Sequence, residues 1–168
     1  YQQVSSAIGI LNDGFLQGWN NGVDPQQSDA QLDFILADKD TSGNQFTDPL
    51  TGSTFNGYRS VNLDDYGLDI FSNQDYEVVL DNVLTIRNTF GYQLDQYLNI
   101  FVLEWSGSVQ GFTWRSSTFN AGYFVRPGTF QSSSGKTNVH EIGHFMGLYH
   151  NFHKQSSQGA RSDYNGYL

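Results

Sequence analysis

All four histidines of this 168-residue chain lie in one short segment near its end, VHEIGHFMGLYHNFH, which covers Val139–His153. Three of them, with a glutamate and a glycine, form the pattern H-E-x-x-H-x-x-G-x-x-H. His140 and His144 are four residues apart, so on a helix both side chains project from the same face. Two imidazoles placed in this way can bind one metal ion. The pattern therefore predicts a helix through His144 that carries a metal site.

The other residues of the pattern complete the chemistry of a catalytic metal. Glu141 is rotated about a quarter turn from His140, so its carboxylate can lie beside the metal and accept a proton from a bound water. Gly147 permits a sharp turn at the end of the helix, which swings His150 round as a third ligand. Three neutral ligands leave one position open for water. We expect one catalytic Zn²⁺ bound by His140, His144 and His150, with Glu141 as the general base.

A chance match is the alternative to the metal site. A bare H-E-x-x-H motif occurs often enough to mislead, whereas Gly147 and His150 at their fixed offsets make coincidence much rarer. Without a metal, the segment would be an amphipathic helix whose histidines lie at the surface or in the core. That alternative leaves the register of three rare residues and a glutamate unexplained, so we favour the metal site.

The segment GKTNVHEIGHFMGLYHNF resembles the zinc-binding segment of the metzincin clan of endopeptidases. Its flanks resemble the pappalysin family of that clan through YLNIFVLEWSGSVQGFTW and AGYFVRPGTF, and further upstream through SSAIGILNDGF and LDFILADKDTSGN. The resemblance covers most of Ser5–Phe152. It implies that His140, His144 and His150 bind zinc and that Glu141 acts as general base and acid.

The resemblance also implies a place for the substrate. The strand near Gly111–Arg115 would be the sheet edge that pairs with an extended peptide, through Gly111, Phe112, Thr113 and Trp114. Backbone pairing of this kind suits unfolded or extended protein segments. The implied partner is therefore a protein or peptide substrate.

Two departures from the family pattern affect what we expect of the whole chain. Metzincins carry a methionine turn beyond the third histidine, but the only methionine here is Met146, and just 18 residues follow His150. The family also has a strand before its first helix, and this chain begins where that strand would end. We therefore expect residues 1–168 to be a single N-terminal catalytic subdomain. The missing C-terminal subdomain would come from the remainder of the chain or from a larger assembly.

The rest of the chain predicts a mixed α/β (α+β) fold. Apolar spacing predicts helices over Val4–Leu16 and 75–92, and the alternation within Leu32–Leu36 predicts a half-buried strand. A last helix would begin near Ser134 or Thr137. Three apolar or aromatic runs predict further strands, over 97–105, 109–116 and 120–128. We expect a metzincin-like, twisted mixed sheet of about four strands with two long helices and a C-terminal active-site helix.

Composition limits the choice of partners. The formal net charge is −9, and Lys and Arg form no cluster that could bind phosphates, so we expect neither nucleic acid nor membrane as a partner. No apolar run approaches the ~20 residues that a membrane span needs. The chain has no cysteine, which excludes thiolate metal ligands. Its richness in Asn, Gln, Ser, Gly and Tyr favours an extracellular, secreted protein.

A second cation site is suggested by DKDTSGN, which begins like an EF-hand calcium loop at Asp38. The twelfth position, where such a loop carries a bidentate glutamate, is Pro49. We therefore expect a solvated turn rather than bound Ca²⁺. His153, three residues beyond His150, is interpreted as a surface histidine rather than a spare ligand.

These features predict a zinc-dependent endopeptidase that hydrolyses peptide bonds of extended protein substrates through a metal-activated water. The alternative is a catalytically inactive domain, stabilised by its metal, within a larger assembly. The missing methionine turn supports the alternative. Glu141 speaks against it, because a purely structural metal site has no need of that base.

Overall fold

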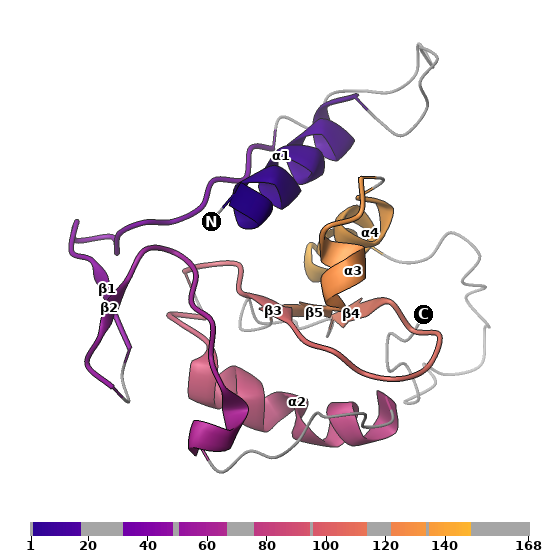
Figure 1. Ribbon diagram of the computed structural model, residues 1–168. Helices are drawn as coiled ribbons and strands as arrows, with labels where there is room; N and C mark the ends of the chain where they lie inside the picture. The colour runs from indigo at the N-terminus through magenta and orange to yellow at the C-terminus, as the bar shows by residue number, and fades with distance from the viewer. Residues whose placement is uncertain are drawn as a thin grey trace, which may run out of the picture. The chain divides into compact units, whose positions relative to one another are not determined.

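The computed structural model describes residues 2–17, 32–48, 51–66, 76–94, 96–113, 122–133 and 135–148. The chain divides into two compact units, unit 1 (Tyr1–Asp69) and unit 2 (Ile70–Leu168), each with its own helices and strands (Figure 1). The predicted mixed α/β class is confirmed. The single domain expected over 1–168 stays a prediction. Among the described helices, none is both long enough and apolar enough to cross a membrane.

Helix α1 of unit 1 spans Gln2–Gln17 and confirms the first predicted helix. Its apolar spacing buries Ala7 and Leu11, each 2% exposed. One turn further along, Phe15 packs against Phe34, with ring centroids 5.3 Å apart. The apolar stripe of α1 therefore holds a segment that follows it in the chain.

The strand predicted over Leu32–Leu36 is wrong, although the pattern of burial is right. Alternate side chains of this segment are partly buried, and Asp33 and Ile35 between them are exposed. The side chain of Asn12 donates from Nδ2 to the Phe34 carbonyl oxygen (2.9 Å), and its Oδ1 accepts from the Phe34 backbone N–H (2.8 Å). Because one amide side chain satisfies both backbone groups, the segment stays extended without joining a sheet.

Unit 1 also contains two short antiparallel strands and a 3-10 turn: β1 (Phe46–Thr47), β2 (Thr54–Phe55) and η1 (Leu63–Tyr66). Phe46 and Phe55 stand opposite each other across the ladder, with ring centroids 5.5 Å apart. The buried carboxylate of Asp48 forms an ion pair with Arg59, whose guanidinium also lies 5.2 Å from the centre of the Phe55 ring. The hairpin is therefore held by an aromatic pair and by one buried charge that has its counterion.

Unit 2 contains a three-stranded sheet in the order β3-β5-β4, built from β3 (Ile100–Val102), β4 (Gly111–Thr113) and β5 (Tyr123–Val125). β3 runs parallel to β5, and β4 runs antiparallel to β5, so the predicted mixed sheet is confirmed. All three strands lie within the predicted runs but are shorter than those runs. In the described part of unit 2 the sheet has three strands rather than about four.

Helix α2 (Tyr76–Phe90) covers one face of this sheet, while α3 (Pro127–Phe130) and α4 (Lys136–Phe145) lie on the other side (Figure 1). The core on the α2 side consists of Val83, Ile86, Trp105, Phe112 and Phe124. The rings of the two phenylalanines stack with centroids 5.1 Å apart. The opposite face of the sheet is left to α4, the helix that carries the first two histidines of the pattern.

Helix α4 begins where the sequence predicts, but neither of the two named residues is its N-cap. The helix begins at Lys136, and its N-cap is Gly135 in the left-handed conformation (φ 56°), which glycine adopts without strain. Thr137 lies inside the first turn, and Ser134 lies outside the described residues. The helix therefore starts on a backbone turn, without a hydrogen bond from a capping side chain.

Candidate metal centre

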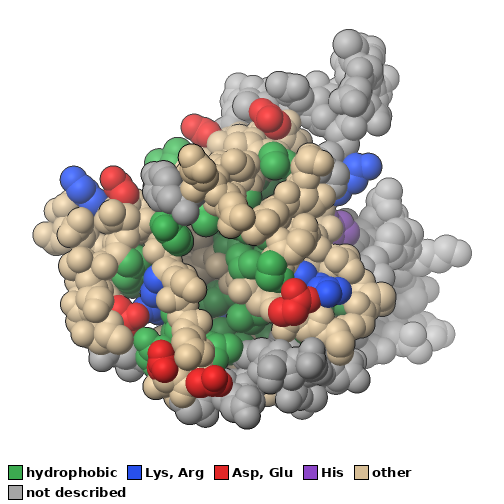
Figure 2. All heavy atoms as spheres, viewed as in Figure 1, with side chains coloured by type: hydrophobic (Ala, Val, Ile, Leu, Met, Phe, Trp, Pro, Cys, Tyr) green, Lys and Arg blue, Asp and Glu red, His purple; other side chains and the backbone are tan. Residues whose placement is uncertain are grey.

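Helix α4 brings the first two predicted ligands together on one face. The Nε2 atoms of His140 and His144 lie 3.0 Å apart, and the rings meet edge to face with centroids 4.5 Å apart. His140 is exposed, whereas His144 is only 7% exposed. Figure 2 shows a histidine side chain at the surface of the molecule. The two imidazoles therefore direct their Nε2 atoms to one place, which opens to solvent on the His140 side.

This spacing suits a shared metal ion. Zinc binds imidazole nitrogen at about 2.0–2.1 Å, so two ligands of one ion stand no further apart than about twice that length. The separation of 3.0 Å between the two Nε2 atoms meets this condition. In the metal-free form the same contact is a hydrogen bond, in which one Nε2 donates to the other.

The helix ends in a glycine turn, as the sequence predicts. Gly147 has a φ of 90°, a conformation that strains any other L-residue. The Gly147 N–H donates to the His144 carbonyl oxygen, and the Leu148 N–H donates to the Gly143 carbonyl oxygen, both at 2.9 Å. This pair of hydrogen bonds is the Schellman motif, which satisfies carbonyl groups at the end of a helix. The turn ends α4 shortly after the second histidine.

The same turn determines the tautomer of His144. It places the Leu148 carbonyl oxygen 2.8 Å from His144 Nδ1. Because a carbonyl oxygen only accepts, Nδ1 carries the proton and Nε2 keeps its lone pair for a metal. Metal-binding histidines commonly have such a partner on the second ring nitrogen. In the metal-free form, it follows that His140 is the donor in the contact between the two rings.

Glu141 points from α4 into the protein and is only 1% exposed. Its carboxylate accepts a hydrogen bond from the Thr113 backbone N–H, while Oε2 has no hydrogen-bond partner among the described residues. Burial raises the pKa of Glu141 to about 8, and the hydrogen bond from Thr113 opposes part of that rise. The carboxyl group thus lies between α4 and β4, and in the metal-free protein it keeps its proton to a higher pH than an exposed glutamate does.

The hydrogen bonds of β4 show which backbone groups face outward. β4 is the outer strand of the described sheet, and the Arg126 N–H donates to the Gln110 carbonyl oxygen just before it (3.1 Å). In an antiparallel ladder only alternate residues bond to the partner strand. Gly111 and Thr113 therefore direct their backbone groups away from β5, and the Thr113 N–H accordingly meets Glu141.

The predicted substrate strand thus lies beside the predicted base. A Cβ atom on Gly111 would stand 3.3 Å from Cγ of Glu141 and 3.0 Å from Cγ2 of Thr137, so α4 packs closely on this strand. The side chain of Phe112 belongs to the core on the α2 side. The outward groups left for pairing are those of Gly111 and the Thr113 carbonyl oxygen, because the Thr113 N–H donates to Glu141. Trp114 lies outside the described residues.

Sequence reasoning missed a buried polar chain behind Glu141. The hydroxyl of Tyr123 donates to Asn138 Oδ1 (3.4 Å), and Asn138 Nδ2 donates to the Phe130 carbonyl oxygen (3.2 Å). Burial raises the pKa of Tyr123, and the nearby charge of Glu141 adds to the rise. The sequence could have indicated that Asn138 lies near Glu141, because it precedes that residue by three positions and so shares its face of α4.

The third predicted ligand, His150, and the neighbouring His153 lie outside the described residues. Across the ranges that the structure describes, His, Cys, Asp and Glu side chains form no group of three that could hold a metal ion. The described site therefore consists of two histidines and one carboxylate, and their binding of a metal stays a prediction, as does the third ligand.

The segment that begins like a calcium loop forms a turn, as predicted. Asp40 Oδ1 accepts hydrogen bonds from the backbone N–H groups of Ser42 (2.9 Å) and Asn44 (2.8 Å). Gly43 occupies the left-handed region with a φ of 84°. Pro49 lies outside the described residues, so the reason for preferring a solvated turn to a calcium site still rests on sequence.

No family model matches the chain, and no solved structure matches it. UPF0422 proteins from the Paris, Philadelphia 1 and Lens strains of Legionella pneumophila are similar to it. The protein of the Paris strain is 30% identical over 132 residues, which make up 79% of this chain and 22% of the relative. The other two are 29% identical over 132 residues. The chain spans 22% of the length of these relatives, and the metzincin resemblance stays a prediction.

Proposed function

We propose that the protein is a zinc-dependent endopeptidase that hydrolyses peptide bonds in extended protein segments. One juxtaposition carries this proposal: the facing Nε2 atoms of His140 and His144 share α4 with Glu141, whose carboxylate meets the outer edge of β4. The resemblance to the metzincin clan, and to its pappalysin family, supports the same activity. An extracellular setting follows from that resemblance and from the composition.

The chain's own residues suit the metal that this activity needs. His140 and His144 would hold zinc through Nε2, and His150 would be the third ligand. The Leu148 carbonyl oxygen keeps His144 in the tautomer that offers Nε2. When bound, zinc supplies Lewis-acid chemistry and makes water more acidic.

Glu141 is positioned to move the protons of the reaction. The backbone groups of Gly111 and the Thr113 carbonyl oxygen face outward from β4 and would hold a peptide extended along this edge, while the Thr113 N–H donates to Glu141. Glu141 meets the same edge, and its Oε2 has no hydrogen-bond partner among the described residues. With zinc bound, this carboxyl group would favour its ionised form, which could then accept the proton of the attacking water and pass it to the amine of the departing peptide.

Substitution of Glu141 tests its catalytic role. We expect Glu141→Ala to retain one zinc ion per chain and to lower the rate of cleavage of a denatured protein by about 10²–10⁴-fold, the usual contribution of a general base. Elemental analysis gives the zinc content, and gel electrophoresis gives the cleavage rate on the same sample. Asp64→Ala, which removes an exposed carboxylate, is the matched control and should leave both quantities unchanged.

Two results would contradict the proposal. Equal cleavage by the wild type and by Glu141→Ala would remove this residue from the mechanism. Zinc bound without hydrolysis of any denatured protein would favour the second candidate function, an inactive metal-stabilised domain within a larger assembly.

A further inference from the structure

Unit 2 contains a polar pocket of about 440 Å³, here named the α3–α4 pocket. Its walls include Glu104, Gln110, Arg126, Thr129 and Thr137, all of which carry hydrogen-bonding side chains. None of these residues takes part in the metal centre. A pocket walled in this way offers several hydrogen-bonding groups to a ligand.

The α3–α4 pocket adjoins the edge of β4 where the proposed substrate would lie. Gln110 directly precedes β4, and Cγ2 of Thr137 lies 3.0 Å from the place of a Cβ atom on Gly111. Thr137 also stands four residues before Glu141, on the same face of α4. The pocket is therefore about one helical turn along α4 from the proposed base. A peptide extended along β4 would reach it with residues on one side of the scissile bond.

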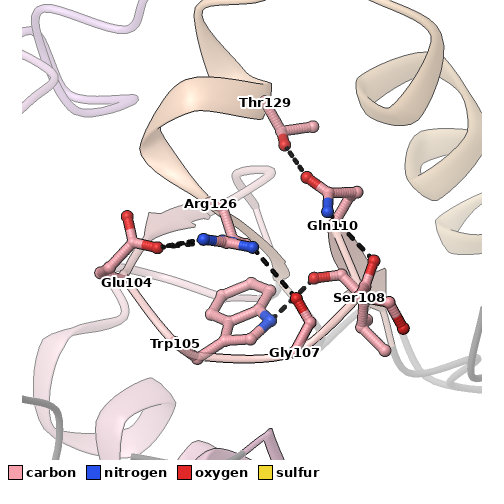
Figure 3. A network of polar contacts seen from close by, with 8 residues as sticks. Glu104, Trp105, Gly107, Ser108, Gln110, Arg126 and Thr129 are labelled. Carbon is pink, nitrogen blue, oxygen red and sulfur yellow. Dashed lines mark hydrogen bonds and ion pairs between the residues drawn. The ribbon is translucent and has the colours of Figure 1, made fainter. Parts of the chain in front are cut away.

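The walls of the pocket hold one another in place (Figure 3). Arg126 donates to Glu104 Oε1 from Nε (3.0 Å) and Nη2 (2.6 Å), and from Nη1 to the Gly107 carbonyl oxygen (3.2 Å). The Thr129 hydroxyl donates to Oε1 of Gln110 at 2.7 Å. These contacts give the walls a defined arrangement of donors and acceptors.

The charges of the pocket favour a ligand without net charge. Arg126 and Glu104 form an ion pair, so a charged side chain that approached one of them would also face the like charge of the other. An apolar side chain would offer no hydrogen bond to the hydroxyl and amide groups of these walls. Amide and hydroxyl groups can both donate and accept, so they match these walls.

We infer that the α3–α4 pocket is a substrate subsite that selects an uncharged hydrogen-bonding side chain, that of Asn, Gln, Ser or Thr, near the scissile bond. The inference rests on the proposed peptidase function and names the class of residue that the site prefers. Its support is the position of the pocket beside β4 together with the internally paired, polar character of its walls.

Two substitutions test the pocket without touching the metal centre. Gly128 lines the pocket, and a Cβ atom at this position would meet no atom within 4 Å, so Gly128→Leu adds an apolar side chain in open space. Thr129→Val removes one hydroxyl at nearly constant volume. Thr85→Val makes the same change at an exposed position of α2 and is the matched control.

The measurement is kcat/KM of the zinc-loaded protein on peptides that carry Gln, Ser, Leu, Lys, Glu or Gly at each position around one cleavage site. We expect the wild type and Thr85→Val to prefer Gln or Ser at one position. Thr129→Val should lower kcat/KM for those peptides about threefold to tenfold, which corresponds to the loss of one hydrogen bond. Gly128→Leu should abolish the preference, while peptides with Gly at that position should be cleaved equally by all four proteins.

Each other outcome overturns a stated claim. Cleavage with identical preferences in all four proteins would overturn the subsite and leave the peptidase function intact. A preference for Lys or Glu that depends on Gly128 or Thr129 would assign the pocket to a charged side chain, against the inference. If the zinc-loaded wild type cleaves no peptide, the proposed function fails and the subsite fails with it. Unchanged zinc content and thermal midpoints establish that the variants are folded.

Discussion

The buried carboxyl group of Glu141 makes the stability of the metal-free protein depend on pH. Burial raises the pKa of this group from 4.5 to about 8, so the folded chain binds the proton more tightly than the unfolded chain does. This tighter binding of the proton contributes fully to the free energy of unfolding below about pH 4.5, and the contribution is lost as the pH rises through 8. We expect Glu141→Gln, which carries no charge, to prevent this loss and to raise the free energy of unfolding at pH 8 by an amount on the order of 1–3 kcal/mol.

Urea denaturation of both proteins in the presence of a chelator, from pH 5 to pH 9, measures this difference. Other titrating groups are common to the two proteins and largely cancel in the comparison. The two curves of unfolding free energy should lie close together at pH 5 and separate as the pH rises. Curves that stay parallel over the whole range would show that folding does not alter the titration of Glu141.

At the residue scale, the sequence could predict what depends on local spacing. His140 and His144 meet because four residues make about one helical turn, and no other part of the chain is needed. The direction of Glu141 depends instead on β4, which is remote in sequence, and only the folded chain shows that this carboxylate meets the Thr113 N–H. The ion pair of Glu104 and Arg126 could not be predicted either, because these two residues are also remote in sequence.

Among the secondary-structure elements, the helices were more predictable than the strands. The 3.6-residue period of α1 and α2 is a local property, and both helices form where the apolar spacing places them. A strand needs a partner that its own pattern does not specify. The alternation in Leu32–Leu36 was correct for burial, yet the side chain of Asn12 took the hydrogen bonds that a neighbouring strand would have made.

The turn after α4 should tolerate no side chain at position 147. Gly147→Ala would place a Cβ atom at a φ of 90°, which we expect to cost about 1–2 kcal/mol of stability. It should also weaken zinc binding about 10–100-fold, because the Leu148 carbonyl oxygen would no longer hold His144 Nδ1. Chemical denaturation measures the first effect, and competition with a chromogenic chelator measures the second.

Gly9→Ala is the matched control for this substitution. Gly9 lies within α1, and a Cβ atom there would meet nothing within 4 Å. Alanine at such a helical position should stabilise the protein by about 0.5–1 kcal/mol and leave zinc affinity unchanged. A Gly147→Ala protein that matched this control in both measurements would show that the turn does not position the second histidine.

At the scale of the whole molecule, the contacts between remote segments were the hardest feature to predict from the sequence. No linker or change in composition marks the point near Asp69 where unit 1 gives way to unit 2. Contacts between segments remote in sequence define the units, as when α1 holds Phe34 or when α4 packs on β4. Such contacts arise from the packing of the finished fold, which a hydrophobic pattern limits without determining.

Zinc should stabilise the whole chain through the third histidine of the pattern. A ligand that binds only the folded state adds about 2.7 kcal/mol when its free concentration is 100 times Kd. We therefore expect zinc to raise the thermal midpoint and a chelator to reverse the rise. His150→Ala should remove most of this rise, because two ligands bind far more weakly than three, whereas His153→Ala should keep it. The opposite result would mean that His153 rather than His150 binds the metal. The H-E-x-x-H-x-x-G-x-x-H spacing would then not identify the three ligands.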